Sequence, residues 1–209
     1  MNLYFSPLAC SLATRISLYE AGAEADYTRV DTRAKRLADG SDFRKINPMG
    51  QVPVLATDEG ALLTENSAVL QYVANRFPQL APTGGIDRSR LQQWLSFIGT
   101  ELHKAVFVPL LDANAPDAAK VYARDKVALR LGILQEHLEG REFLLDRFTI
   151  ADAYLVTVLN WSAVTGVDLG QWPAVRDYHQ RLQKRASVAK ALSEELAMYQ
   201  DQQRSAAKL

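Results

Sequence analysis

The feature that most constrains the fold is an abrupt change of pattern near the N-terminus. Leu3 to Phe5 is a short apolar run typical of a buried strand, Ser6-Pro7 cannot extend it, and residues 11–18 then follow helical spacing. The chain is therefore predicted to open with a strand that leads directly into a helix. Cys10 lies at or just before the first turn of that helix, where free backbone N–H groups and the helix dipole favour a thiolate.

Cys10 is the only cysteine of the 209 residues, so the chain has no internal disulfide framework. From its position alone, it is either a reactive thiol with a lowered pKa or a buried cysteine that packs as a small apolar side chain. Lys and Arg together number 24, as do Asp and Glu, so the overall charge gives no reason to expect a nucleic acid or an anionic membrane as partner. The sequence shows neither a signal peptide nor a run of membrane-spanning length, and we expect a cytoplasmic protein.

The residues after the first helix predict the rest of an α/β half. Residues 26–30 alternate polar and apolar as a second strand, and a strand-helix-strand opening favours parallel pairing. A polar loop with a short helix near residues 41–46 follows. Strands near 52–55 and 61–64 are joined by a turn as a hairpin, and residues 65–67 open another helix. Only an X-Pro bond adopts the cis form at low cost, and the sequence leaves open whether the bond before Pro53 is cis.

A break in pattern then separates this half from a helical one. Residues 78–85 contain two prolines and two glycines, and no strand signal follows them. We therefore expect a domain over residues 1–77, a linker over 78–86, an all-helical domain over 87–200 and a polar tail over 201–209.

Apolar spacing and capping signals predict the helices of the second half. One long helix carries Leu91 to Leu102, and a second ends near Leu138. Thr149 and Asp152 form a capping pair, which we assign to folding, and the helix after them is apolar on all sides and should be the buried centre of this half. Two further helices are expected, one starting at Pro173 and one from about Val188 to Met198.

These features together resemble the cytosolic glutathione transferases, and within them the bacterial beta class. The resemblance covers nearly the whole chain and implies an α/β N-terminal thioredoxin-like domain plus an all-α C-terminal helical domain. Five segments in the family's order carry it: Pro7-Leu12, Gln51-Pro53, Glu65-Leu70, Glu101-Lys104 and Phe148-Tyr154.

The resemblance implies that Cys10 is the active-site cysteine, lying beside the glutathione sulfur and able to form a mixed disulfide with it. In other classes of the family, a Tyr or Ser hydroxyl holds the glutathione thiolate. Tyr4 and Ser11 are the corresponding hydroxyls here, and each has an alternative role, Tyr4 in strand packing and Ser11 as a helix cap.

The resemblance also implies the residues that bind the rest of glutathione. Val52, between Gln51 and Pro53, would pair its backbone with the cysteinyl part as an added strand. Glu65 and Asn66 would bind the γ-glutamyl group; the family commonly has Ser or Gly in place of Asn66, but the backbone N–H survives that change. The alternatives are a plain turn at Pro53 and an ordinary N-cap at residues 65–66.

Other side chains would complete the site. Lys35 would reach the glycyl carboxylate, although the neighbouring Arg36 could do the same. Ser96, His103 and Lys104 match cleft residues of the helical half. Ser96 and His103 are seven residues apart and are expected to share a helix face, but the family more often has Asn at the position of Ser96. His103 would face Cys10, donating a hydrogen bond or moving a proton near neutral pH.

The implied function is a glutathione S-transferase with glutathione as co-substrate and no metal. It would conjugate the glutathione thiolate to small apolar electrophiles and exchange thiols through Cys10. One alternative is that the chain is mainly a glutaredoxin-like thiol transferase or a reductive dehalogenase. Another is a non-catalytic ligand-binding or regulatory protein of the same fold. The family resemblance also implies a homodimer that pairs the first domain of one chain with the helical domain of the other.

Overall fold

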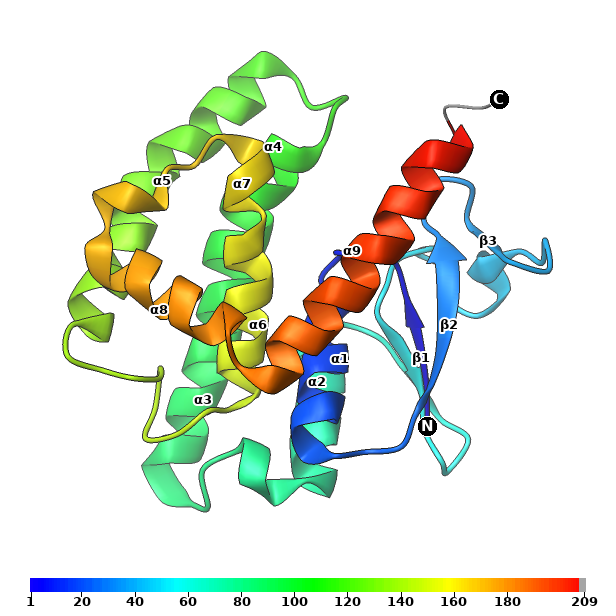
Figure 1. The fold of residues 1–209 in the computed structure, drawn as a ribbon, viewed down its shortest axis with the longest axis horizontal. Helices are drawn as coiled ribbons and strands as arrows, with labels where there is room; N and C mark the ends of the chain where they lie inside the picture. The colour runs from blue at the N-terminus through cyan, green and yellow to red at the C-terminus, as the bar shows by residue number, and fades with distance from the viewer. Residues whose placement is uncertain (207–209) are drawn as a thin grey trace. The chain divides into compact units, whose positions relative to one another are not determined.

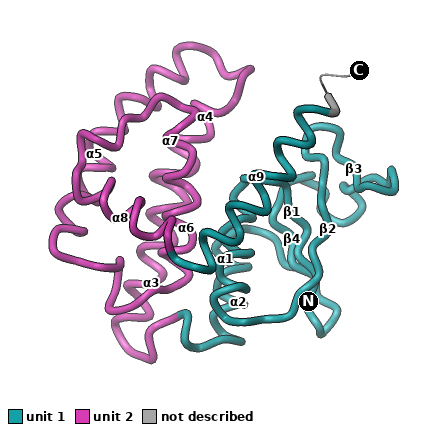
Figure 2. Tube along the Cα trace, in the orientation of Figure 1, with its two compact units in different colours: residues 1–80, 185–209 teal, residues 81–184 magenta. Residues whose placement is uncertain are grey.

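The structure is a computed structural model that describes residues 1–206. The chain divides into two compact units (Figure 2). Residues 1–80 form the first unit together with the C-terminal segment from residue 185, and residues 81–184 form the second.

A five-stranded sheet lies at the centre of the first unit, in the order β3-β2-β1-β4-β5. The strands are β1 Asn2–Phe5, β2 Asp26–Asp31, β3 Arg36–Leu37, β4 Val54–Ala56 and β5 Leu62–Leu63. β1 pairs with β2 in parallel, and β4 forms an antiparallel hairpin with β5, which confirms the predicted strand-helix-strand opening and the hairpin. β3 was not predicted, because two residues inside a polar loop give no alternating pattern.

Helices pack on this sheet and on one another. They are α1 Leu12–Ala21, α2 Asn66–Arg76 and α9 Ala186–Ala206, with short 3₁₀ turns η1 Phe43–Lys45 and η2 Pro78–Leu80. Residues 12–18 of α1 are all buried, because α1 contacts α2, α9 and β1. Figure 1 shows α9 running beside α1. Gly22 ends α1 in the left-handed conformation, with φ of 65°, as its position in the sequence predicted.

The last helix differs from the sequence-based expectation in length and in grouping. The sequence analysis placed residues 87–200 in one domain, whereas α9 groups with the first unit because its residues pack on α1. Its start is tied to the end of α1, since the Glu20 carboxylate accepts hydrogen bonds from Arg185 and Ser187. The helix also continues through residues 201–206, which belong to the segment expected as a polar tail; residues 207–209 lie outside the described part.

The second unit, residues 81–184, contains helices joined by loops and has no strand, as predicted. Its helices are α3 Gly85–Phe97, α4 Val108–Leu111, α5 Asp117–Leu138, α6 Ile150–Asn160, α7 Ser162–Thr165 and α8 Pro173–Gln183, with a 3₁₀ turn η4 Leu169–Gln171. The long helix predicted through Leu102 is interrupted. α3 passes into a π-helical stretch, η3 Ile98–Phe107, before α4 begins.

α6 is the buried centre of this unit. Ten of its residues, 150–159, are buried, which confirms the interpretation of a helix apolar on all sides. The predicted capping box is present: Asp152 accepts from the Thr149 backbone N–H at 2.8 Å, and the Thr149 hydroxyl accepts from Ala151 at 3.3 Å. Asp152 also accepts hydrogen bonds from the Leu144 N–H and the Tyr178 hydroxyl, and so joins the α5–α6 connection to α8.

Within the described residues, each helix is too short or too polar to cross a lipid bilayer.

Candidate functional site

The loop before α1 holds Cys10 two residues ahead of the first helical residue, Leu12. Leu8 adopts a left-handed backbone conformation, with φ of 61°, and its N–H donates to the buried Glu195 carboxylate at 2.7 Å. The Ser11 hydroxyl bonds to both backbone groups of Ser6, each at 3.3 Å. The Leu8 contact connects the loop to α9, and the Ser11 contacts connect the two ends of the loop to each other.

Cys10 lies against the segment that leads into β4. Its Sγ donates to the Val52 carbonyl oxygen at 3.3 Å, and the thiol side chain is half-buried. Because a carbonyl oxygen only accepts, the sulfur carries its proton in this contact. The Val52-Pro53 peptide bond, left open by the sequence, is cis.

The two alternative hydroxyls, Tyr4 and Ser11, have structural roles in the first unit. The Tyr4 ring lies 5.8 Å from the ring of Phe43 and packs against the buried cluster that also contains Val52. Ser11 is fully buried and makes no side-chain cap of α1, because its hydroxyl bonds back to Ser6. Of these three side chains, Cys10 is the one whose polar atom contacts the Val52 backbone.

Glu65 and Asn66 stand at the N-terminus of α2. Glu65 has a φ of 64°, rare for a residue with a side chain, and makes no side-chain cap of the helix. The Asn66 side chain is buried, yet neither its oxygen nor its nitrogen has a hydrogen-bond partner among the described residues. An ordinary N-cap does not account for this arrangement, because the capping bond is absent.

Lys35 and Gln51 lie on the loops beside Val52. The Lys35 ammonium donates to the Gly50 carbonyl at 2.9 Å, and the Gln51 carbonyl accepts from the Asn47 side chain at 2.7 Å. Gly50 is required here: its φ is 59°, and an added Cβ would come within 2.7 Å of the Lys35 side chain. Arg36 instead donates to the Gly40 carbonyl, so of the two basic residues Lys35 is the one that contacts the Val52 segment.

In the second unit, His103 and Lys104 lie in the π-helical stretch η3. Such stretches are rare and often occur at functional sites. His103 is buried, with 9% of its surface exposed, and Lys104 is exposed. The His103 Nδ1 lies 2.7 Å from the Tyr154 hydroxyl on α6, and the Trp161 ring lies 4.9 Å from the imidazole.

Two expectations for this stretch change. Ser96 is exposed and His103 is buried, so they do not share a face, because a π-helical turn takes more residues than an α-helical one. Burial, with the nearby Lys104 ammonium, lowers the pKa of His103 to about 4. His103 is therefore neutral near pH 7, which favours hydrogen-bond donation over proton transfer near neutral pH.

The other two histidines have packing roles, as expected. His137 lies 4.4 Å from the Trp94 ring and bonds through Nε2 to the Leu144 carbonyl. His179 bonds through Nε2 to the Asn160 side chain.

The sequence analysis missed a buried charge cluster between α1 and α9. The Arg15 guanidinium lies 4.2 Å from the ring centres of both Phe5 and Tyr27 and pairs with Glu194 and Glu195. Arg15 and Glu195 are both essentially fully buried. The one local signal was a single charged residue within the otherwise uncharged stretch 12–18. This cluster connects α9 to the Cys10 loop, because Glu195 is also the acceptor of the Leu8 N–H.

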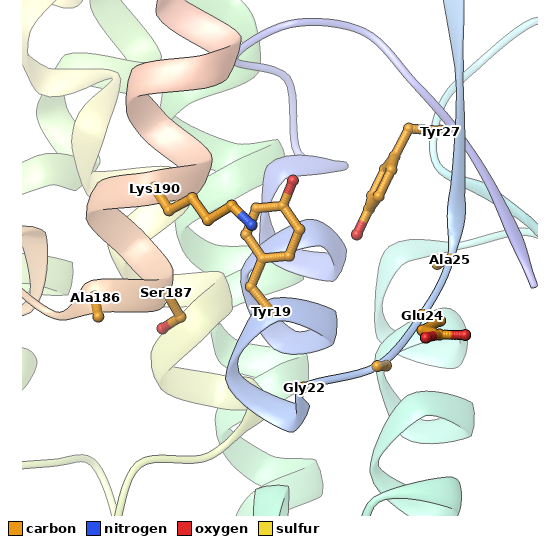
Figure 3. A pocket seen from close by; sticks show the side chains of 9 residues that line it. Tyr19, Gly22, Glu24, Ala25, Tyr27, Ala186, Ser187 and Lys190 are labelled. Atoms are coloured by element: carbon orange, nitrogen blue, oxygen red, sulfur yellow. The ribbon is translucent and has the colours of Figure 1, made fainter.

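A separate hollow of about 620 Å³ lies at the other end of α1 (Figure 3). Tyr19, Gly22 and Tyr27 line it from α1 and β2, and Ser187 and Lys190 line it from α9. It includes none of the residues that the sequence analysis assigned to the site. Within residues 1–206, no three His, Cys, Asp or Glu side chains cluster in a way that would hold a metal ion.

Comparison with known proteins places both units in one family. Residues 2–75 match the family model described as "Glutathione S-transferase, N-terminal domain", and residues 100–186 match "Glutathione S-transferase, C-terminal domain". The chain is 41% identical to glutathione S-transferase GstA of Escherichia coli O157:H7, over 93% of this chain and 98% of the relative.

Solved structures give the same result. A sphingomonad glutathione S-transferase complexed with glutathione is 42% identical with a TM-score of 0.88, and the match covers 93% of this chain and 98% of that one. A bacterial beta class glutathione S-transferase of Sphingomonas chungbukensis is 43% identical, with the same TM-score and the same coverage. The chain therefore belongs to the glutathione S-transferase family, as its motifs predicted, and is an enzyme of that family.

Proposed function

We propose that the first unit binds glutathione as an extended peptide along Val52, with its γ-glutamyl group at Asn66 and its glycyl carboxylate near Lys35. The thiolate of glutathione then lies beside Cys10 and attacks a small apolar electrophile, forming a carbon–sulfur bond as the leaving group of the electrophile departs with the bonding electrons. Holding both reactants in place and stabilising the thiolate supply the rate.

The observation that carries this proposal is the contact of 3.3 Å between the Cys10 sulfur and the Val52 carbonyl oxygen. Val52 precedes β4 and lies outside the strand pairing. An extended peptide recognises such a backbone by adding to it as a strand. A glutathione cysteinyl group paired with Val52 would have its sulfur next to that of Cys10.

The buried Asn66 side chain supports the place of the γ-glutamyl group. Buried amides nearly always have hydrogen-bond partners, and an unpartnered one calls for an explanation. Both amide atoms of Asn66 lack a partner among residues 1–206. The adjacent N-terminus of α2 offers free backbone N–H groups to a carboxylate, so an α-amino acid group would satisfy both features.

We also propose that Cys10 exchanges thiols with glutathione. The Cys10 thiol first loses its proton to solvent, and the thiolate then attacks one sulfur of oxidised glutathione. The S–S bond of oxidised glutathione breaks, a mixed disulfide forms, and one glutathione leaves as its thiolate. A second glutathione thiolate then attacks the mixed disulfide and releases Cys10. The chain has one cysteine, so exchange follows this monothiol route.

The test combines intact mass with turnover. Wild type and Cys10→Ala are incubated with oxidised glutathione, weighed by mass spectrometry, and assayed for conjugation of glutathione to an activated chloronitrobenzene. We expect a glutathione-sized adduct on the wild type alone, and conjugation that persists in Cys10→Ala. Loss of conjugation in Cys10→Ala, with exchange intact in wild type, would favour the thiol-transferase or reductive-dehalogenase alternative.

The non-catalytic alternative gives a different result. A ligand-binding or regulatory protein of this fold would show no adduct, no conjugation and no retention on immobilised glutathione. The presence of Cys10, Val52 and an unpartnered Asn66 in one unit argues against that outcome.

We further propose that the protein is a homodimer in the cytoplasm. Four apolar side chains on α5, Val121, Tyr122, Leu129 and Ile133, are 43–64% exposed. Their exposure to water is unfavourable, and a second copy of the chain would remove it by covering them. Light scattering after gel filtration should give twice the chain mass for wild type and a monomer for Leu129→Glu. A wild-type monomer would contradict the dimer, and a protein exported from the cell would contradict the location.

A further inference from the structure

The hydrogen bond between His103 and Tyr154 joins the π-helical stretch to the buried core of the second unit. The Tyr154 hydroxyl lies 2.7 Å from Nδ1 of His103. The exposed fraction is 2% for Tyr154 and 9% for His103. Both residues belong to the same unit, and the contact is held by two elements that pack on each other, α6 and η3.

Because the imidazole is neutral, its contact with Tyr154 determines which ring nitrogen carries the proton. A neutral imidazole has one nitrogen that donates and one that accepts, and the partner of either nitrogen selects the tautomer. Burial keeps His103 neutral near pH 7, with a pKa of about 4. A phenol hydroxyl can donate to Nδ1, and the proton of the ring is then on Nε2.

The neighbouring rings limit how the imidazole can turn. The Trp161 ring lies 4.9 Å from the imidazole at 57°, and the Tyr154 ring lies 5.9 Å away, nearly perpendicular at 88°. A flipped ring would lose its hydrogen bond to Tyr154 in a buried place, where an unmade bond is costly. The orientation of His103 is thus set by groups that come from the core.

We propose that Tyr154 is a positioning residue, whose hydroxyl donates to Nδ1 of His103 and thereby keeps Nε2–H as the hydrogen-bond donor of this site. The inference rests on the proposed function for one step, that conjugation of glutathione depends on this Nε2–H. The orientation and tautomer of His103 do not depend on that step.

The place of Tyr154 in the fold suits this role. It lies on α6, whose residues 150–159 are all buried, five residues after the Thr149 cap. A group that orients a functional side chain is effective when its own position is fixed by packing. His103, in contrast, lies in irregular helix, where the backbone alone defines the side chain less tightly.

The first test reads the tautomer directly. Long-range ¹H–¹⁵N spectra of the uniformly labelled protein report which imidazole nitrogen carries the proton, and the chain has three histidines. His137 provides an internal reference, because its Nε2 faces a carbonyl oxygen and must carry its proton. We expect His103 to be the Nε2–H tautomer in wild type and to shift toward Nδ1–H or a mixture in Tyr154→Phe. A wild-type Nδ1–H tautomer, or an unchanged His103 in Tyr154→Phe, would overturn the proposal.

The second test separates positioning from packing. Tyr154→Phe should lower kcat for conjugation about tenfold, the size of one lost hydrogen bond, with little change in KM for glutathione. Adding it to His103→Ala should have no further effect, because Tyr154 acts through His103. Thr157→Val is the matched control, since it removes a buried hydroxyl of the same helix that bonds only within α6, to the Ala153 carbonyl. It should leave the His103 tautomer and kcat unchanged.

The two tests distinguish failure of the inference from failure of the proposed function. Additive effects of Tyr154→Phe and His103→Ala on kcat would refute a role through His103. A wild-type protein without conjugation activity would refute the catalytic step and the proposed function, while the tautomer spectra would still decide whether Tyr154 positions the ring.

Discussion

Replacing Asp152 with alanine should destabilise the second unit far more than the loss of a helix cap. A cap alone contributes about 1 kcal/mol to stability, which is the contribution that the sequence suggests for the Thr149–Asp152 pair. In the structure, however, the fully buried Asp152 carboxylate accepts four hydrogen bonds. They come from the backbone N–H groups of Thr149 and Leu144 and from the hydroxyls of Thr149 and Tyr178, at 2.8–2.9 Å.

The magnitude follows from those four bonds. Each contributes about 1 kcal/mol net, and Asp152→Ala also leaves two buried N–H groups without acceptors, so we expect a loss of about 4–6 kcal/mol. That is a large share of the stability of an ordinary domain, roughly 5–15 kcal/mol. Thr149→Ala should cost only about 2 kcal/mol, because it removes the two bonds of the Thr149 hydroxyl, to the Ala151 N–H and to Asp152. It leaves the Asp152 carboxylate with three donors: the backbone N–H groups of residues 144 and 149 and the Tyr178 hydroxyl.

Urea unfolding followed by circular dichroism, with linear extrapolation to water, measures both losses on the same scale. Tyr178→Phe combined with Asp152→Ala should be less than additive, because the two residues share one hydrogen bond. If Asp152→Ala costs no more than Thr149→Ala, then Asp152 is a local cap, and the argument that it joins the α5–α6 connection to α8 is wrong.

Three further predictions concern single groups. Burial lowers the pKa of His103 from 6.5 to about 4, so as pH falls the unfolded chain takes up this proton first. The contribution of His103 to the free energy of unfolding should therefore be complete above pH 6.5 and decrease by about 3 kcal/mol toward pH 4. Urea unfolding at each pH should show a smaller decrease in this free energy for His103→Asn than for wild type, and an equal decrease would contradict the prediction. Asn66→Ala should weaken glutathione binding about tenfold, as measured by calorimetry. It should cost little stability, because the Asn66 amide has no hydrogen-bond partner among the described residues. An unchanged affinity for glutathione would show that Asn66 is not part of the binding site. Arg15→Met should lower the free energy of unfolding in urea by about 3–5 kcal/mol, because Glu195 is left buried without its ion-pair partner. Adding Glu195→Gln should recover much of that loss. An Arg15→Met variant as stable as wild type would refute the pairing.

The features that the sequence predicted are those that local patterns determine. A strand ended by Ser6-Pro7, a helix ended by Gly22 and a prolonged absence of strand signals after residue 85 each depend on neighbouring residues. The order of these elements was enough for the family resemblance. Cys10 and Val52 were identified separately, and only the fold brings the sulfur within 3.3 Å of the carbonyl oxygen.

The features that the sequence did not predict depend on residues far apart in the chain. Arg15 and Glu194 are 179 positions apart, and neither segment alone indicates that α9 packs on α1. The π-helical stretch was missed because a heptad spacing assumes regular α-helix, and one irregular turn moved His103 to a different face from Ser96. The Tyr154 hydroxyl was hidden for a related reason, since its neighbours in sequence mark it only as part of a buried helix.

Departures from the family pattern should affect binding or activity only at positions that act through a side chain and not through the backbone. In the proposed binding mode, the groups offered to glutathione at Val52 and at the N-terminus of α2 are mostly backbone N–H and carbonyl groups, which any residue type supplies. Asn in place of the family's Ser or Gly at position 66 is therefore compatible with binding. A role for Ser96 would depend on its side-chain hydroxyl and not on its backbone. That side chain is exposed, and Ser96 precedes the π-helical stretch that contains His103. The chemistry of the second unit should thus depend on His103, whose ring is fixed by Tyr154 and Trp161, and not on Ser96.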